Sequence, residues 1–391
     1  MKVSVLDYGA GNVRSLLNAL NAVGCEVEMI ETAEQITSAR VLIFPGVGAC
    51  GKCMEVLKAR GWVDALKAYV RADKPYFGIC LGLQTLFEGS EESPGVSGLG
   101  LLPGIVGRFS GVGGRSVPQI GWNTLTQCQP SGLLDGVAPG DAVYFVHSFR
   151  AARTAALEPW ALTLTSYGEE YVSAVQRGKV MACQFHPEKS GKVGLRMLHN
   201  FAVMSLADTP ARSPPTMPPK PSGPKRGYCK RIIACMDVRA NDQGDLVCTK
   251  GDQYDVREKS SDGGEKGGVR NLGKPVALAK KYYDQGADEI TFLNITGFRD
   301  CPLTDTPMLA LIVEASKEIF VPLTVGGGIR GFTDANGVKT TSLEVADAYF
   351  RAGADKVSIG SDGTRSGSRA AAQLHAYQEQ RRRQQRQQRH Q

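Results

Sequence analysis

The sequence predicts an α/β protein with two halves, a mainly parallel sheet followed by part of a (β/α)8 barrel. Short apolar runs alternate with helical patterns in both halves, which is typical of parallel sheets covered by helices. Residues 208–227 hold seven of the twenty prolines and mark a linker between the halves. In the second half, a helix followed by Gly-Ala-Asp and a strand occurs twice, at 286–288 and 353–355, and this repeated step is typical of a barrel.

The first half, residues 1–207, begins with a strand over 2–6 and a glycine-rich turn over 7–12. Its middle, residues 99–175, is richer in β-type residues and turns. The further elements that the pattern predicts before this middle are a helix over 15–23, strands over 25–30 and 40–44, a helix over 55–70 and a strand leading into Gly78.

In the second half, residues 228–362, predicted strands alternate with predicted helices. The pattern predicts strands over 230–237, 288–294, 320–325 and 356–359 and helices over 275–285, 308–318 and 342–352. No fifth strand is recognisable after residue 362, and a complete barrel needs about 250 residues. We therefore expect a partial barrel with open sheet edges, which is marginal alone.

Residues 363–391 form a low-complexity tail, for which we expect disorder. An altered C-terminus, such as a frameshift, would explain the abrupt change in composition. The formal charge of +7 comes largely from five arginines in residues 381–391. Because the rest is nearly neutral, a nucleic-acid partner is not indicated, although RNA binding by the tail is the alternative reading.

Composition also bears on compartment and metals. No apolar run approaches the ~18 residues of a membrane span. The ten cysteines show no disulfide framework, and Cys50-x-x-Cys53 lacks a second pair of ligands at metal spacing, so we expect neither a metal nor a cofactor. No leader is recognisable, and we expect a cytoplasmic protein, or one of the plastid stroma if a transit peptide is missing from this sequence.

The strongest local motif is Gly78-Ile79-Cys80-Leu81-Gly82, which follows an apolar run and precedes a helical pattern. Its glycines permit a strained strand-to-helix turn that presents the Cys80 thiol at the end of a sheet. The N-terminus of the following helix would lower the pKa of the thiol. The alternative is a buried structural cysteine.

His186 and Glu188 are two residues apart near the end of the first half. In an extended segment both side chains point to one face, where the imidazole could take the thiol proton and the carboxylate could hold its tautomer. With Pro187 between them, a surface loop fits the same pattern.

Together these motifs resemble those of the triad-type, class I glutamine amidotransferases. The resemblance rests on residues 78–84, 45–48 and 184–190, and residues 7–12 and 144–148 narrow it to the glutaminase of imidazole glycerol phosphate synthases. Residues 230–237, 292–296, 324–330 and 353–362 resemble the cyclase of that family. The order of the two parts is that of the fused eukaryotic form, which acts in histidine biosynthesis. The family implies a flavodoxin-like first domain and a TIM-barrel second domain.

The resemblance implies a role for each glutaminase residue. Cys80 would attack the glutamine amide, His186 would act as general base and then as general acid, and Glu188 would orient it. The backbone N–H groups of Leu81 and, after a flip, of Val47 would hold the oxyanion. The residues placed against the substrate glutamine would be Gly48, Gln84 and Ser148. Alternatively, Gln84 lies on an exposed helix face and the neighbouring His147 is a core histidine.

For the cyclase, the resemblance implies that Asp237 is one of two acid/base aspartates. Backbone N–H groups of Gly327 and Gly328, together with Lys250, would bind the phosphates of a ribonucleotide substrate. Three residues at the base of the barrel would gate the entry of ammonia, unless they form ordinary surface ion pairs: Arg231, Glu289 and Lys356.

The second aspartate of the family lies on the fifth strand, and no segment here corresponds to it. We therefore expect glutamine hydrolysis by this chain and a cyclase step that is defective in the chain alone. The alternative function is a non-catalytic regulatory or assembly subunit that pairs with a full-length synthase.

Overall fold

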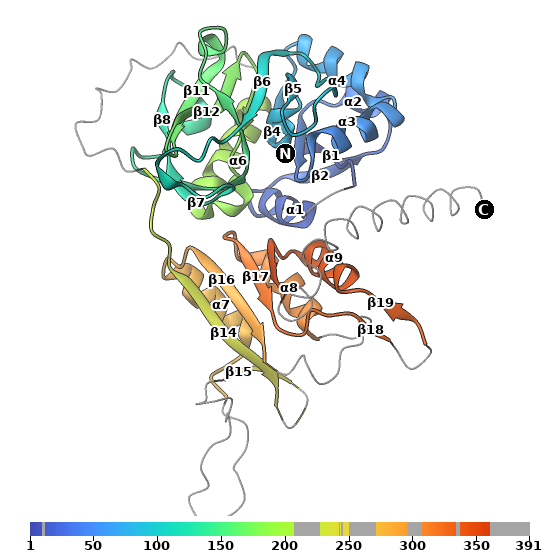
Figure 1. Cartoon of the computed structure of the whole chain (residues 1–391), viewed down its shortest axis with the longest axis vertical. Coiled ribbons are helices and arrows are strands. Elements are labelled where there is room, and N and C mark those ends of the chain that lie inside the picture. Colours follow the sequence, from blue (N-terminus) through green and yellow to red (C-terminus); the bar gives the residue numbers. More distant parts are fainter. Residues whose placement is uncertain are drawn as a thin grey trace, which may run out of the picture. The chain divides into compact units, whose positions relative to one another are not determined.

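The computed structural model describes residues 1–9, 12–206, 227–241, 243, 245–249, 271–295, 307–333 and 337–359. The described residues divide into two compact units, which lie mainly within 1–232 and 233–359 (Figure 1). Both units combine sheet and helix, so the α/β class is confirmed. The predicted linker, the tail and Lys250 lie outside the described residues, except for Gly227 at the end of the linker.

The first unit is built on one large sheet whose parallel strands run in the order β2-β1-β3-β4-β13. The bounds of these strands are Lys2–Leu6 for β1, Glu26–Ile30 for β2, Leu42–Gly46 for β3, Tyr76–Cys80 for β4 and Val180–Cys183 for β13. Their side chains are mostly apolar on both faces, as expected for a parallel sheet covered by helices.

Beyond β13 the sheet continues with β12-β10-β6-β5, and β11 and β8 attach beside β12. These strands are β5 Phe87–Ser90, β6 Leu102–Arg108, β8 Thr126–Gln127, β10 Phe149–Ala152, β11 Ala161–Ser166 and β12 Glu170–Arg177. A separate antiparallel pair joins β7, Gln119–Thr124, to β9, Ala142–His147. The predicted β-rich middle is therefore the mainly antiparallel part of this unit, although its first strand, β6, pairs parallel with β5.

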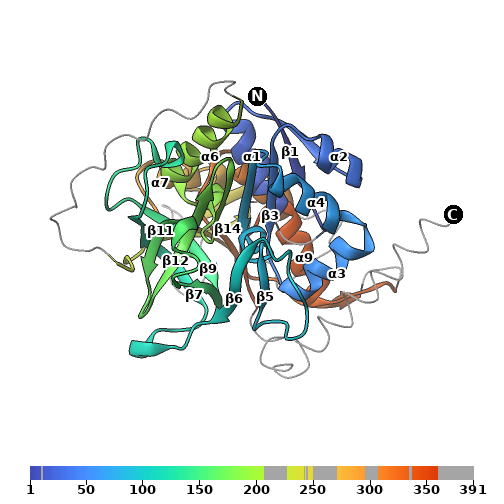
Figure 2. The same ribbon diagram turned by 90° about the horizontal axis from the view of Figure 1, so that it is seen from above.

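Helices cover both faces of the parallel strands. Figure 2 shows α1 and α6 on one side and α2, α3 and α4 on the other. Their bounds are Val13–Ala22, Gly191–Leu206, Ala33–Ser38, Cys50–Ala59 and Trp62–Arg71, respectively. The single helix expected over 55–70 is instead two helices, because Gly61 adopts φ 68° between α3 and α4.

Strand β4 lies in the middle of this unit and is fully buried. Its side chains alternate between the two helical layers: Phe77 stacks on Phe201 of α6 at 4.9 Å between ring centroids, while Tyr76 belongs to the core that includes Leu57 and Leu66 of α3 and α4. Because β13 runs parallel to β4, with Cys183 opposite Ile79, both strands end at the same edge of the sheet. Cys80 and the segment after β13 are thereby brought together.

The second unit has a five-stranded sheet in the order β15-β14-β16-β17-β20. Four strands are parallel: β14 Ile233–Ala240, β16 Glu289–Asn294, β17 Leu323–Gly326 and β20 Lys356–Ser358. The helices described in this unit are α7 Pro275–Asp284, α8 Pro307–Glu318 and α9 Ser342–Ala352. This alternation is the one that the sequence predicts.

Three features of this unit differ from expectation. β14 begins at Ile233, three residues later than predicted, and it pairs antiparallel with a strand that was not predicted, β15, Leu246–Thr249. A small hairpin of β18, Phe332–Thr333, and β19, Lys339–Thr340, follows β17. Strands this short give no periodicity that a sequence pattern can reveal.

Candidate active site

Cys80 occupies a strained turn between β4 and a single helical turn, α5, Leu81–Gln84. Its backbone has φ 54° and ψ −100°, which is rare for a residue other than glycine. The turn also needs its flanking glycines. A Cβ on Gly82 would lie 1.9 Å from the Phe44 carbonyl oxygen, and one on Gly78 would lie 2.6 Å from the Gly82 oxygen. The predicted nucleophile elbow is therefore present.

The expected helix dipole finds little support. α5 is only four residues long, and aligned peptide dipoles add up over several turns. Cys80 is a buried residue, 7% exposed, and its thiol has another polar neighbour. The side-chain amide of Gln184, which follows β13 directly, donates to its sulfur.

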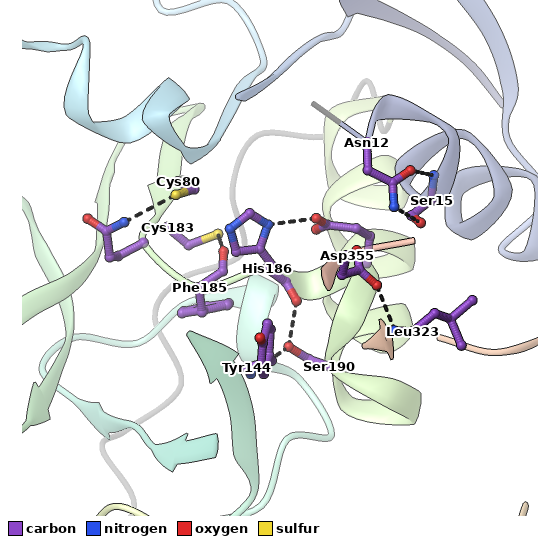
Figure 3. A network of polar contacts seen from close by, with 12 residues as sticks. Asn12, Ser15, Cys80, Tyr144, Cys183, Phe185, His186, Ser190, Leu323 and Asp355 are labelled. Carbon is purple, nitrogen blue, oxygen red and sulfur yellow. Dashed lines mark hydrogen bonds and ion pairs between the residues drawn. The ribbon is translucent and has the colours of Figure 1, made fainter. Parts of the chain in front are cut away.

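His186 and Glu188 form a buried pair beside the thiol (Figure 3). The Nδ1 atom of His186 lies 2.7 Å from Oε1 of Glu188. Since a carboxylate only accepts, Nδ1 carries the proton and Nε2 is left for the sulfur. Nε2 makes no hydrogen bond of ordinary geometry among the described residues, but the Cys80 sulfur is near enough to affect its protonation.

The backbone around this pair is held by Ser190. Its hydroxyl donates to the His186 carbonyl at 2.6 Å and accepts from the Tyr144 N–H at 3.0 Å. The His186 N–H in turn donates to the Tyr144 carbonyl at 2.9 Å. These bonds fix the short 3-10 turn Pro187–Lys189 against β9, so Pro187 does not place His186 and Glu188 in an exposed loop.

The charges of the pair favour an imidazolium. Burial alone would lower the pKa of His186, but the negative charges of Glu188 and of a Cys80 thiolate outweigh it and hold the pKa well above its usual range. A protonated His186 next to a thiolate is the resting form of an activated cysteine nucleophile. The site can therefore attack a carbonyl carbon and then return a proton to a leaving group.

A chain of two glutamines leads away from the sulfur. The Gln184 Nε2 atom lies 3.4 Å from Cys80 Sγ, and its Oε1 accepts from Gln84 Nε2 at 2.9 Å. Gln84 also donates to the Phe149 carbonyl at 3.2 Å. Gln84 is 6% exposed, which excludes the alternative of an exposed helix face.

The loop after β3 carries Val47 and Gly48. The Tyr8 hydroxyl donates to the Val47 carbonyl, and a Cβ on Gly48, whose φ is 105°, would lie 3.5 Å from that hydroxyl. Gly46 pairs with Cys80 in the sheet, so this loop starts beside the nucleophile. The loop that carries the Val47 N–H thus starts beside the nucleophile, and the Tyr8 hydroxyl anchors the next peptide group, between Val47 and Gly48.

His147 and Ser148 lie between β9 and β10. His147 is a core histidine: burial, helped by the charge of His186, lowers its pKa to about 3, although the hydrogen bond to the Phe149 carbonyl opposes this. Its ring packs among Phe109, Phe145 and Tyr171. Ser148 is half-buried, and its carbonyl accepts from the Phe109 N–H at 3.0 Å.

In the second unit, Asp237 lies in β14 opposite Leu293 of β16 and Thr249 of β15. Burial and the charge of Asp237 together raise the pKa of Cys248 to about 11. Gly327 and Gly328 follow β17 with φ of 83° and 73°. A Cβ on Gly327 would lie 2.2 Å from the Asn294 oxygen, so only glycine fits there.

The structure brings two of the predicted gate residues together. The buried carboxylate of Glu289 on β16 contacts the Lys356 ammonium of β20 and accepts from the Thr324 hydroxyl at 2.7 Å. This is not an ordinary surface pair, since the Glu289 side chain is 4% exposed. Arg231 belongs to the first unit, where its guanidinium donates to the Ile120 carbonyl at 3.3 Å.

Sequence reasoning missed two contributors, Gln184 and Tyr8. Gln184 is part of the motif that contains His186, and only the alignment of β13 with β4 places its amide on the thiol. Tyr8 follows β1 and reaches Val47 because β1 neighbours β3. The spacing of residues along the chain does not predict either contact.

Cys50 and Cys53, the other cysteines singled out by the sequence, are buried. Burial raises the pKa of Cys50 to about 11, and it raises that of Cys53 still further. Within the described ranges, no group of three or more His, Cys, Asp and Glu side chains could hold a metal ion. None of the helices seen in those ranges is long and apolar enough to cross a membrane.

Comparisons with known proteins agree with this geometry. Residues 4–205 match the family "Glutamine amidotransferase class-I", and residues 231–382 match "Histidine biosynthesis protein". The second match continues twenty residues beyond Asp362, further than the resemblance seen in the sequence. Both matches agree with an α/β fold in each half.

Three curated relatives are similar over long stretches. The "Imidazole glycerol phosphate synthase hisHF, chloroplastic" of Arabidopsis thaliana is 54% identical over 92% of this chain and 59% of its own length. The hisHF synthase of Emericella nidulans is 49% identical over 92% of this chain and 66% of its own. The HisH subunit of Deinococcus radiodurans is 44% identical over 51% of this chain and 92% of its own.

The chain thus spans less than two thirds of the fused relatives and nearly the whole length of the separate HisH subunit. The first family covers the Cys80 site, and the second covers β14 to β20. With its two parts in this order, the chain belongs to the family of fused imidazole glycerol phosphate synthases, with a class I glutamine amidotransferase part followed by a histidine biosynthesis part.

Proposed function

We propose that the chain hydrolyses glutamine and supplies the ammonia to the cyclase part of an imidazole glycerol phosphate synthase. The observation that carries the proposal is the buried arrangement of Cys80, His186 and Glu188 at the end of β4 and β13. An intact triad argues against the non-catalytic alternative, because a purely structural site has no need of a strained cysteine beside a histidine–carboxylate pair.

In the first step the Cys80 thiolate attacks the side-chain amide carbon of glutamine. The S–C bond forms and the carbonyl electron pair moves to oxygen, which the N–H groups of Leu81 and Val47 would hold. Loss of one such donor typically costs ~10²–10³ in rate. As the intermediate collapses, the C–N bond breaks and His186 gives its proton to the nitrogen, so ammonia leaves and a thioester remains.

In the second step a water attacks the thioester. His186, now neutral, takes the proton of that water, the C–S bond breaks, and glutamate and the thiolate are released with the imidazolium restored. Glu188 keeps the Nδ1 proton in place through both steps. Gly48, Gln84 and Ser148 remain the residues that we propose for glutamine binding, and the start of the Gly48 loop beside Cys80 supports this.

The released ammonia would react with a ribonucleotide, the phosphoribulosyl-formimino aminoimidazole carboxamide ribonucleotide, to form imidazole glycerol phosphate, with release of the aminoimidazole carboxamide ribonucleotide and water. We propose Asp237 as an acid/base group, and Gly327, Gly328 and Lys250 for the phosphates. The positive φ angles of the two glycines after β17 support an N–H-lined turn. For the ammonia gate, the Glu289–Lys356 contact supports two members, with Arg231 as the third.

The division into an amidotransferase domain (1–207), a linker (208–227), a barrel part (228–362) and a tail (363–391) also remains a proposal. So does the compartment: the similar Arabidopsis protein is named chloroplastic, and we propose cytosol or plastid stroma for this chain.

The test is ammonia release from glutamine by the purified chain, measured with and without the ribonucleotide. We expect slow release that depends on Cys80 and is lost in Cys80→Ala. Equal release by that variant and by the unsubstituted chain would overturn the proposal.

A further inference from the structure

Gln184 is a buried side chain that the steps above do not use. It follows β13 directly, is fully buried, and its backbone N–H donates to the Ser173 carbonyl of β12 at 2.8 Å. Its position is therefore fixed by the sheet. Its side-chain Nε2 lies 3.4 Å from the Cys80 sulfur, within the range of an N–H···S hydrogen bond.

The direction of this hydrogen bond follows from its neighbours. The Phe149 carbonyl can only accept, so the Gln84 atom that faces it is the NH₂ group. The same NH₂ group contacts Gln184, which must then present its oxygen to Gln84, at 2.9 Å. The Gln184 NH₂ group is left pointing at Cys80. The amide cannot be turned over without breaking two contacts.

The Phe149 carbonyl at the far end of this chain is itself well held. It also accepts from His147 Nδ1 at 2.8 Å, and His147 Nε2 lies 3.3 Å from the Tyr171 hydroxyl. Because burial keeps His147 neutral, its Nδ1 proton stays on the carbonyl side. The series from Tyr171 to Cys80 is therefore a single network that ends at the nucleophile (Figure 3 shows its last contact at Cys80).

We propose that Gln184 is a catalytic residue, whose side-chain N–H stabilises the Cys80 thiolate, and that Gln84 is the positioning residue that aims it. The inference rests on the proposed glutaminase function. In it, the Gln184 N–H gives the thiolate the stabilisation that the short helix α5 does not supply through its dipole. A hydrogen bond to a charged group is stronger than one to a neutral group, so this donor favours the thiolate over the thiol.

The consequence for reactivity is specific. Without the donor, the midpoint of thiol ionisation should move up by about 1 pH unit, and the thiolate fraction below the midpoint should fall about tenfold. A more basic thiolate is also more nucleophilic, by about threefold per unit. The variant should thus react about threefold more slowly at pH values below both midpoints and about threefold faster where both proteins are fully ionised.

The experiment measures the rate of alkylation of Cys80 by iodoacetamide from pH 5 to 10, with the Cys80 peptide quantified by mass spectrometry. Gln184→Met removes the donor at similar volume. Gln184→Glu still accepts from Gln84 but turns an oxygen toward the sulfur, and we expect a larger shift. Gln84→Met should give a smaller shift in the same direction.

Gln129→Met is the matched control, because this half-buried glutamine also donates to two carbonyls, those of Ala161 and Gln176, away from the thiol. It should leave the profile unchanged. A crossing of the Gln184→Met and unsubstituted profiles supports the proposal. An unshifted profile, or a uniform loss of rate at every pH, overturns it, and Gln184→Glu and Gln84→Met decide the matter if Gln184→Met does not fold.

Alkylation does not require glutamine turnover, so the proposal and the glutaminase function fail in different ways. A shifted profile without ammonia release by the unsubstituted chain would refute only the glutaminase function. Where turnover is seen, we expect Gln184→Met to lower kcat about threefold on the acidic side of the pH profile with KM nearly unchanged, because the donor contacts the thiolate. A rise in KM alone would mean that Gln184 binds substrate instead, and would overturn the proposal.

Discussion

The Nδ1 atom of His186 lies 2.7 Å from Oε1 of Glu188, and the two side chains are only 7% and 9% exposed. In this dry environment the carboxylate is the main group that keeps a positive charge on the imidazole. The protonation of His186, and with it the thiolate of Cys80, therefore depends on Glu188.

Glu188→Gln should leave the geometry nearly intact and remove the charge. We expect ammonia release to fall by at least about 10²-fold, as in other triads that lose their carboxylate. Because the pKa of His186 falls, the alkaline limb of the pH–rate profile should move to lower pH. Steady-state ammonia release over a range of pH measures both effects. An unchanged alkaline limb in a folded variant would mean that Glu188 does not hold the charge on His186.

The tight turn at Cys80 can be tested through stability. Gly82→Ala would place a methyl group 1.9 Å from the Phe44 carbonyl, and backbone cannot move aside as a side chain can. We expect a loss of about 3 kcal/mol in the free energy of unfolding of the first unit, measured by denaturant titration. Gly227→Ala is the control, since its methyl group would meet no atom within 4 Å. Equal stabilities of the two variants would contradict the close approach.

Much of the site was predictable from the sequence because its signals are local. Cys80 is flanked by glycines that only a strained turn requires, and His186 and Glu188 are separated by one residue, so each motif could be recognised alone. Alternation of apolar runs and helical patterns predicted the parallel strands on either side of Cys80, and the positions of α7, α8 and α9 to within two residues at each end.

The contacts that could not be predicted join segments far apart in the chain. Gln184 reaches Cys80 across a sequence separation of 104 residues, and Tyr8 reaches Val47 across 39. Both depend on which strands are neighbours, which periodicity does not reveal. The break between α3 and α4 was missed for another reason: the apolar pattern continues through Gly61, whose positive φ ends the helix.

A stability measurement can distinguish the ion pair of Glu289 and Lys356 from an ordinary surface ion pair. Lys356→Met removes the ammonium that faces a buried carboxylate, and we expect a loss of about 2 kcal/mol in the stability of the second unit. Adding Glu289→Gln should restore most of it, because the uncompensated charge is then gone. Lys280→Met, which breaks the exposed pair with Asp284, should cost less than about 0.5 kcal/mol. Hydrogen exchange of the amides of β16 and β17 reports on this unit, and strictly additive effects of the two substitutions would contradict the coupling.

His147 should make the first unit sensitive to acid. Its pKa is about 3 in the folded protein against an ordinary 6.5, so between these values the unfolded chain binds a proton that the folded chain does not. Stability must then fall as the pH falls below 6.5, by up to about 1.4 kcal/mol per pH unit. His186, whose pKa is raised, acts in the opposite sense and in a different window: its contribution is complete below 6.5 and is lost as the pH rises through its folded value.

Denaturant titrations at pH 6.5 and 5.0 separate these contributions. Between the two, the unsubstituted chain should lose about 2 kcal/mol through His147, and His147→Gln should lack that loss. His199→Gln, at an exposed position of α6, should follow the unsubstituted chain. If His147→Gln lost as much stability on acidification as the unsubstituted chain, the ring would not be held neutral in the folded protein. The donor and acceptor assignment of the Gln84–Gln184–Cys80 hydrogen bonds would then lose the support that it takes from a neutral His147.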